Sequence, residues 1–255
     1  LEEKKKISCI EGERYAQMSD IVINNYARFQ KASPKVSKNS SGYYLWDVYN
    51  PHTKNFNLTK LFTGSQGTLS IVTQIKFRLI CPQKHRRLLV VFLKDMSHLA
   101  EVTRRILEFS PESFESYDDH TFKVALKFLP ELAKKLRGGL VRLMFNFLHE
   151  FWIIFMHGLP KLILLAEFSG ETETTAYQKA LAAEKSLAGL NLNTKISLPG
   201  YDTEKYWLMR RESFNFLREK IKNLRTAPFI DDIIVQPKRL PEFLPQLYSI
   251  LDGYP

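Results

Sequence analysis

Two continuous apolar runs constrain the fold of this chain more than any other feature of its sequence. Residues 88–93 read Leu-Leu-Val-Val-Phe-Leu, and residues 161–168 read Lys-Leu-Ile-Leu-Leu-Ala-Glu-Phe. Short apolar runs without helical periodicity are typical of buried strands. Because strand and helix patterns alternate around these two runs, the sequence predicts an α+β sheet covered on one side by helices.

The segments around the two runs predict the remaining elements. Further strands are expected over 43–49, 70–80, 113–117, 194–197 and 229–235. Helices are expected over 11–25, 98–109, 119–136, 172–187, 202–224 and 240–251. Ser97 is expected to cap the second of these helices, and Pro241 falls in the first turn of the last one.

The composition predicts a folded chain with a basic surface. Of its 255 residues 44% are hydrophobic and 13% aromatic, and the net charge is +10. The surplus Lys and Arg lie in small clusters, none as long as a nucleic-acid-binding tail. A solvated basic surface and affinity for an anionic cofactor, substrate or membrane surface both remain open. Nucleic-acid binding is not expected, because no RNP, zinc or helix-turn-helix pattern is present.

The cysteines and the start of the chain indicate the cellular compartment in which the protein is expected. Cys9 and Cys81 are too few for a disulfide framework or a zinc cluster and suit a reducing, cytoplasmic setting. The chain begins with Leu-Glu-Glu-Lys-Lys-Lys rather than a signal peptide, and we expect it to be a fragment of a longer protein. Residues 140–168 are the most apolar region, but charges and Pro160 interrupt them, which favours a buried or interfacial segment over a membrane span. Peripheral contact with the inner face of a membrane stays an open alternative.

A loop of small residues runs into the expected strand at 70–80. Its sequence is Gly64-Ser65-Gln66-Gly67-Thr68. Glycine permits positive φ and close approach to the main chain, and successive amides in such a loop form a concave anion site suited to a pyrophosphate. A strand rather than a helix follows, so this is not the dinucleotide GxGxxG pattern. A glycine-rich hairpin loop is the alternative.

The window from Gly64 to Thr73 resembles a signature of a flavoprotein family. The signature is the Gly-Ser-Glu-Gly-Thr-Leu-Gly-Ile-Val-Thr of FAD-linked oxidases of the vanillyl-alcohol-oxidase (PCMH) type, in their D-lactate dehydrogenase and glycolate oxidase branch, with Gln66 and Ser70 as departures. Segments 38–45, 206–212 and 229–244 resemble further family blocks in the family order.

The resemblance implies two domains. Residues 1–82 would end a PCMH-type FAD-binding domain, and 83–255 would form a ferredoxin-like FAD-oxidase cap, the substrate domain, incomplete at its end. The first FAD-binding half would precede Leu1. The segment that carries the catalytic base and the ligands of a divalent metal would follow Pro255.

The resemblance also implies the residues that contact FAD. The elbow before residue 43 would face the flavin or its pocket through Asn39, Ser41 and Gly42. The glycine loop would meet the pyrophosphate and ribose through Gly64, Ser65, Gly67 and Thr68. The start of the following strand would offer main-chain groups to the adenine edge at Ile71 and Val72.

Arg210 is the residue that the resemblance implies for the substrate carboxylate. It lies one helical turn from Trp207 and one from Phe214, and a guanidinium held between aromatics can bind a carboxylate through two hydrogen bonds. A surface arginine whose stem packs on aromatics is the alternative. Arg211 is expected to point elsewhere on the helix.

Acidic and histidine pairs in the chain are not expected to bind a metal. Asp231 and Asp232 would point to opposite faces of a strand, and His149 and His157 lack the spacing of HExxH. Relatives that act on dicarboxylic hydroxy acids carry a lysine near Ile230, and its absence argues against a second carboxylate clamp.

The function that the resemblance implies is FAD-dependent dehydrogenation of a 2-hydroxy acid, of D-lactate or glycolate type. A base would remove the hydroxyl proton while the α-hydrogen passes to the flavin as hydride; the electron acceptor is not predicted. The fragment alone is expected neither to hold FAD tightly nor to turn over. The departures at Gln66, Ser70, Ile230 and Gln236 leave an alternative, a non-catalytic flavoprotein relic that binds a partner subunit or an anionic membrane. An ether-lipid-synthase-like flavoprotein is a third option.

Overall fold

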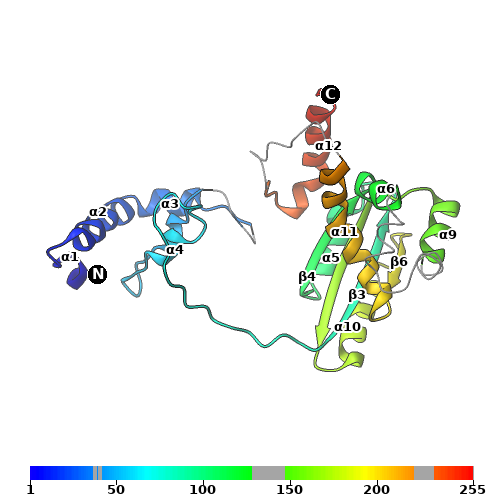
Figure 1. Cartoon of the computed structure of the whole chain (residues 1–255), viewed down its shortest axis with the longest axis horizontal. Helices are drawn as coiled ribbons and strands as arrows, with labels where there is room; N and C mark the ends of the chain where they lie inside the picture. Colours follow the sequence, from blue (N-terminus) through cyan, green and yellow to red (C-terminus); the bar gives the residue numbers. More distant parts are fainter. Residues whose placement is uncertain (37–38, 40–41, 128–146, 221–232, 255) are drawn as a thin grey trace. The chain divides into compact units, whose positions relative to one another are not determined.

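The computed structural model describes residues 1–36, 39, 42–127, 147–220 and 233–254 (Figure 1). The chain forms two compact units. Unit 1 comprises Leu1–Leu79 with Phe229–Gln236, and unit 2 comprises Ile80–Pro228 with Pro237–Pro255.

Unit 1 is a small helical unit with one two-stranded sheet. Its elements are α1 (Glu2–Lys5), α2 (Ile10–Asn24), α3 (Tyr26–Ala32), η1 (Leu45–Asp47), β1 (Tyr49–Asn50), β2 (Asn55–Phe56) and α4 (Thr59–Phe62). Strands β1 and β2 pair antiparallel. Its core consists of Val22, Val48 and Leu61, with partly buried apolar side chains around them. The expected helix at 11–25 is confirmed by α2, whereas the expected strand over 43–49 is wrong, because residues 45–47 form a 3₁₀ turn.

The expected strand at 70–80 is also wrong in the described structure. The segment is extended but pairs with no strand among the described residues. Its apolar side chains are exposed, with Ile71 at 92%, Phe77 at 74% and Leu79 at 88%. A β-branched alternating pattern favours extended backbone, but a strand also requires a partner for its N–H and C=O groups.

Unit 2 is built on a four-stranded antiparallel sheet. Its strands are β3 (His85–Leu93), β4 (Ser113–Asp118), β5 (Leu162–Gly170) and β6 (Asn193–Ile196), in the order β4-β5-β3-β6. The two long central strands pair over their whole length, from His85 opposite Gly170 to Leu93 opposite Leu162. The expected strands at 88–93, 113–117, 161–168 and 194–197 are therefore confirmed.

Helices surround this sheet. They are α5 (Leu99–Leu107), α6 (Asp119–Lys127), α9 (Leu148–His157), α10 (Glu173–Ser186), α11 (Tyr201–Lys220) and α12 (Leu240–Leu251), with the 3₁₀ turn η2 (Pro237–Arg239) before the last. Each expected helix beyond residue 98 is found where it is described; residues 128–136 and 221–224 lie outside the described residues. Thr172 caps α10 by accepting from the Thr175 amide. Ser97 does not cap α5, because His98 holds the cap position and the Ser97 hydroxyl donates to Asp95.

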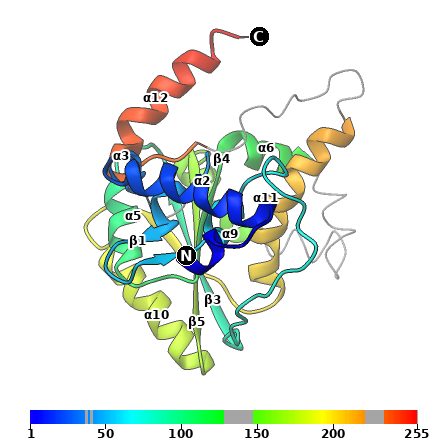
Figure 2. The same ribbon diagram turned by 90° about the vertical axis from the view of Figure 1, so that its left-hand side faces the viewer.

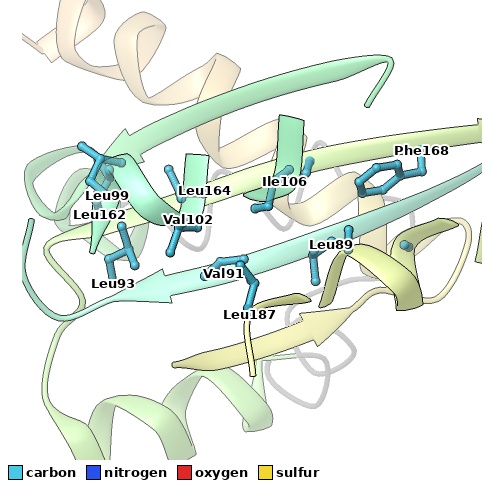
Figure 3. Packing of buried hydrophobic residues seen from close by; sticks show 13 residues of the cluster. Leu89, Val91, Leu93, Leu99, Val102, Ile106, Leu162, Leu164, Phe168 and Leu187 are labelled. Atoms are coloured by element: carbon cyan, nitrogen blue, oxygen red, sulfur yellow. The ribbon is translucent and has the colours of Figure 1, made fainter. Parts of the chain in front are cut away.

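The sheet is covered on both faces, so the expectation of one helical layer is wrong (Figure 2). On β3, Leu88, Val90 and Phe92 belong to a core cluster with α6, α9 and α11. The alternate residues Leu89, Val91 and Leu93 pack against α5 and α10 (Figure 3). Because side chains alternate across a strand, a run that is apolar at every position needs cover on both sides.

The expected strand at 229–235 falls partly outside the described residues. Residues 229–232 are not described, and residues 233–236 are not in a strand. Gln236, one of the departures from the family pattern, donates from its side chain to the Lys35 carbonyl within unit 1. Both cysteines are free and exposed.

Candidate functional site

The glycine loop of unit 1 forms an exposed turn directly after α4. Gly64, Gln66 and Gly67 all have positive φ, at 79°, 52° and 75°. A Cβ on Gly64 or on Gly67 would meet no atom within 4 Å. The glycines are therefore required by backbone conformation, not by crowding within the chain, and the space beside them is open to another molecule.

Two backbone hydrogen bonds within the turn hold its conformation. The Ser65 amide donates to the Phe62 carbonyl at 3.2 Å, and the Thr68 amide donates to the Ser65 carbonyl at 3.0 Å. Within the described part of the chain, the amides of Gly64, Gln66 and Gly67 have no hydrogen-bond partner. Amides left unpaired in a turn with positive φ form a concave anion site, so the turn fits the phosphates of a dinucleotide.

The structure brings the elbow next to this turn. The Tyr43 and Thr68 hydroxyls form a hydrogen bond of 2.9 Å. Gly42, directly before Tyr43, has a φ of 69° and is exposed. Asn39 is partly buried, and Ser41 lies outside the described residues. Two of the segments predicted to contact FAD are thus neighbours, and their contacts with a flavin stay predictions.

The remaining predicted FAD residues lie on either side of this arrangement. Ser65 is buried inside the turn, with 7% of its surface exposed. Ile71 and Val72 follow the turn in the extended segment, with exposed side chains. Their role as main-chain contacts to adenine stays a prediction.

Unit 2 contains a cavity of about 600 Å³ along the edge strand β4. It reaches both sides of that strand, because Glu115 and Tyr117 line it together with their alternate neighbours Phe114 and Ser116. Helices α5, α11 and α12 supply the other walls. The remaining lining residues are Met96, Leu99, Thr103, Asp118, Thr121, Leu162, Leu164, Arg210, Leu240, Leu244 and Tyr248.

Arg210 lies in this cavity and pairs with Glu115. Its Nε donates to Glu115 Oε2, and the two side chains are 45% and 39% exposed. Among the described lining residues Arg210 is the one cation. The arrangement places a guanidinium and an acidic partner at a cavity wall that water and a small solute can reach.

Arg211 points elsewhere, as expected. With Trp207 it lines a different hollow, together with Arg86, Glu112, Ser113 and Glu167. Trp207 packs partly against the core under α11. The position of Arg210 between two aromatics stays a prediction, because the Phe214 side chain lies outside the described residues.

Sequence reasoning missed Glu115. The alternation in Ser-Phe-Glu-Ser-Tyr places Glu115 on the same strand face as Tyr117. That pattern could have marked the residue as facing a helix. Its partner on α11 follows 95 positions later, and only the tertiary packing brings the two together.

A buried charge network ties α9 to α11. Glu150 on α9 and Lys205 and Tyr206 on α11 are at most 1% exposed. Glu150 Oε1 accepts hydrogen bonds from Lys205 Nζ at 2.9 Å and from the Tyr206 hydroxyl. Lys195 on β6 donates to Asp202 at 2.9 Å and to Glu150 at 3.3 Å.

Burial and mutual charge set the protonation of this network. Burial opposes ionisation of Glu150, but Lys205, Tyr206 and Lys195 outweigh it and lower the pKa of the Glu150 carboxyl. Burial raises the pKa of the Tyr206 hydroxyl well above its usual value, and Glu150 raises it further. At neutral pH Glu150 is therefore a carboxylate and Tyr206 a protonated donor, as their hydrogen bond requires.

The described residues contain no group of three or more His, Cys, Asp or Glu side chains placed to hold a metal ion. Asp231 and Asp232 lie outside the described residues, as does the His149 side chain.

Comparison with known proteins places these features in a family. The profile of the family described as "FAD linked oxidases, C-terminal domain" matches residues 82–255. The chain belongs to the FAD-linked oxidases. FAD is the cofactor that this family implies, and the exposed amides at Gly64–Gly67 fit its phosphates.

Three similar proteins are named D-2-hydroxyglutarate dehydrogenase. The protein from Escherichia coli K12 is 22% identical over 95% of this chain, and that from Pseudomonas putida KT2440 is 21% identical over 95%. The protein from Haemophilus influenzae Rd is 19% identical over 88% of the chain. The matched regions are only 22%, 23% and 21% of the respective relatives. The chain therefore corresponds to about a fifth of each relative's length.

The buried network generates a stability prediction. Glu150→Gln removes the carboxylate that Lys205 and Tyr206 share, and we expect a loss of about 3 kcal/mol in the free energy of unfolding at neutral pH. Because the pKa of Glu150 is lowered in the folded state, its stabilisation is present above its ordinary pKa. It is lost as the pH falls through the lower folded value. Urea unfolding from pH 7 down to about pH 3 should show a flatter acid limb for the variant.

Glu204→Gln is the matched control, because Glu204 lies on α11 and is exposed. It should change the free energy of unfolding by less than about 0.5 kcal/mol. Equal stability of the Glu150 variant and this control would show that the buried network contributes nothing.

Proposed function

We propose that the protein containing this chain oxidises a 2-hydroxy acid with FAD, and that unit 2 binds the acid through Arg210. The observation that carries the proposal is an arginine at the wall of a cavity within a domain of the FAD-linked oxidase family. A guanidinium can donate two parallel hydrogen bonds to a carboxylate, which fixes the orientation of the adjacent α-carbon. When bound, FAD supplies the acceptor for the α-hydrogen.

Glu115 would act on the same step. It accepts from Nε of the guanidinium, so it competes with a substrate carboxylate for the charge of Arg210. Because both side chains are about 40% exposed, their pairing is weak in water and the exchange costs little. Glu115 then tunes the affinity for acids without touching the reacting atoms.

Two classes of 2-hydroxy acid are candidate substrates for this site, a monocarboxylate and a dicarboxylate. D-lactate or glycolate fits the absence of a lysine near Ile230, and Arg210 is the one cation among the described lining residues. D-2-hydroxyglutarate is supported by the names of the similar proteins, and a cavity of about 600 Å³ has room for a five-carbon diacid. We propose the monocarboxylates and D-2-hydroxyglutarate as the first compounds to test.

The experiment is anaerobic bleaching of the flavin in the full-length protein. Each of D-lactate, L-lactate, glycolate and D-2-hydroxyglutarate is added in turn, and loss of the oxidised flavin band is followed. Bleaching by one of the D-acids or glycolate supports the proposal. Flavin that none of these acids bleaches would contradict it and favour the non-catalytic alternative.

Arg210→Ala should raise the KM for the preferred acid by about a hundredfold, because a charge-assisted pair of hydrogen bonds is lost. Flavin content should stay unchanged. Arg211→Ala is the matched control, since Arg211 is the next residue and lines a different hollow. A similar rise in KM for both variants would remove Arg210 from the substrate site.

Glu115→Gln should lower the KM by about two- to fivefold, because the substrate carboxylate no longer competes with a charged partner of Arg210. Steady-state kinetics at low ionic strength measure the effect best, since salt screens an exposed pair. A raised KM would contradict this competition and show instead that Glu115 positions Arg210.

Gly67→Ala tests the phosphate site. The added Cβ meets no atom of the chain, but it projects into the open space beside the unpaired amides, so flavin per protein should fall about fivefold or more. Gly189→Ala is the matched control, because Gly189 also has positive φ (87°) and open space around it. Equal flavin content, read from absorbance after gel filtration, would place the flavin phosphates elsewhere.

A further inference from the structure

The cavity of unit 2 has a large apolar wall that the binding of a carboxylate by Arg210 does not use. The side chains of this wall are Leu99 of α5, Phe114 of β4, Leu162 and Leu164 of β5, and Leu240 and Leu244 of α12. All of them belong to the core cluster on the α5 and α10 side of the sheet, or pack against it. Such a wall gains free energy when it covers an apolar group and none when it covers a charged one.

The strand register places the apolar wall on the opposite face of β4 from Glu115. Ser116 pairs with Leu164, and Asp118 pairs with Leu162. Directly opposite residues of an antiparallel pair share a face of the sheet, so Ser116 and Asp118 lie on the face of the apolar wall. Glu115 alternates with them and pairs with Arg210. Because β4 is an edge strand, an acid bound by Arg210 can pass its tail around this edge to the wall.

Asp118 places a negative charge at the end of the wall. Its carboxylate accepts a hydrogen bond from the Thr121 amide at 2.8 Å. Lys123 and Lys161 pair with the next residue, Asp119. A second carboxylate that approached Asp118 would meet a charge of its own sign, which is a common way to reject a wrong ligand.

Tyr248 of α12, which also lines the cavity, lies within reach of this charge. Burial raises the pKa of its hydroxyl, and the negative charges of Asp118 and Asp119 raise it further. Among the described lining residues one cation, Arg210, stands against two carboxylates, Glu115 and Asp118. An acid with one carboxylate needs only Arg210, whereas a diacid brings a second charge to the side where Asp118 lies.

We propose that this cavity selects 2-hydroxy acids with a single carboxylate and an aliphatic side chain, and that Asp118 rejects a second carboxylate. The inference rests on the proposed function, since it takes Arg210 as the group that holds the acid. A three-carbon acid fills on the order of 100 Å³, so a cavity of about 600 Å³ has room for a longer chain on the wall.

Ligand-observed NMR titrations of the whole 255-residue chain test the selection without flavin. The ligands are D-2-hydroxypentanoate and D-2-hydroxyglutarate, which both have five carbons and differ at the far end, together with D-lactate. We expect D-2-hydroxypentanoate to bind about tenfold more tightly than D-lactate, because each buried methylene contributes about fourfold. We expect it to bind about tenfold more tightly than the diacid, because of the charge of Asp118.

Asp118→Asn separates charge from structure. Asparagine keeps a side-chain oxygen for the Thr121 amide and caps a helix as well as aspartate does, so the variant should fold. It should narrow the preference for D-2-hydroxypentanoate over the diacid by about fivefold. Glu171→Gln is the matched control, because Glu171 is an exposed carboxylate of unit 2 that does not line the cavity. It should leave the preference unchanged.

Leu244→Ser tests the apolar wall. It should weaken binding of D-2-hydroxypentanoate by about fivefold and leave D-lactate unaffected, because only the longer acid reaches the wall. Circular dichroism of each variant establishes that the fold is retained. Equal losses for both acids would contradict a tail on this wall.

Three results would overturn the selection: no binding of any acid, tighter binding of the diacid, or a preference that Asp118→Asn does not change. The proposed function is judged by a different measurement, flavin bleaching in the full-length protein. Selective binding to the chain without bleaching by any acid would contradict the enzymatic function alone. Faster bleaching by D-2-hydroxyglutarate than by D-2-hydroxypentanoate would leave that function intact and overturn the selection.

Discussion

The antiparallel pairing of β3 with β5 is the interaction on which the rest of unit 2 depends. Nine residues of each strand pair in register, and β3 is buried continuously from Leu88 to Leu93. A strand buried on both faces is stable only between two layers of apolar cover. Helices α5 and α10 supply one layer, and α6, α9 and α11 supply the other.

The second layer brings the charged residues of unit 2 into place. Placing α11 over the sheet buries Lys205 and Tyr206, and Glu150 of α9 satisfies both. The same helix presents Arg210 to the edge strand, where Glu115 meets it. Because β4 pairs with β5 alone among the described strands, its other edge is left beside the cavity. The same placement of α11 over the sheet therefore completes the core and brings Arg210 to the cavity.

Local patterns predicted much of the fold, and their failures share a cause. The helices α5, α6, α10, α11 and α12 and the four strands of unit 2 follow from patterns within each segment, whereas α9 (Leu148–His157) was not predicted. The strand expected at 70–80 fails because no described strand pairs with this segment, and local pattern alone does not supply a partner. The prediction that helices cover only one side of the sheet is wrong, because the sequence pattern does not show which helices pack on which face. Ser97 fails as a cap because Asp95, two residues earlier, competes for its hydroxyl.

Some features of the candidate site were likewise recognisable from the sequence, and others were not. The glycine turn was recognisable from sequence, since positive φ at Gly64 and Gly67 is a local property that residue type reveals. The FAD-linked oxidase family was recognisable for a similar reason, because its signature is a contiguous string. The pairing of Arg210 with Glu115 and the buried pairing of Lys205 with Glu150 were not recognisable from the sequence.

The sequence by itself determined most of the helices and strands of unit 2, the glycine turn, and which family the chain belongs to. These depend on residues close together in the chain. Only the tertiary structure decided that Glu115 faces Arg210 and that Glu150 of α9 turns inward to Lys205 and Tyr206. Each of those outcomes depends on how elements tens of residues apart pack against one sheet, because burial and charge pairing are properties of the assembled layers.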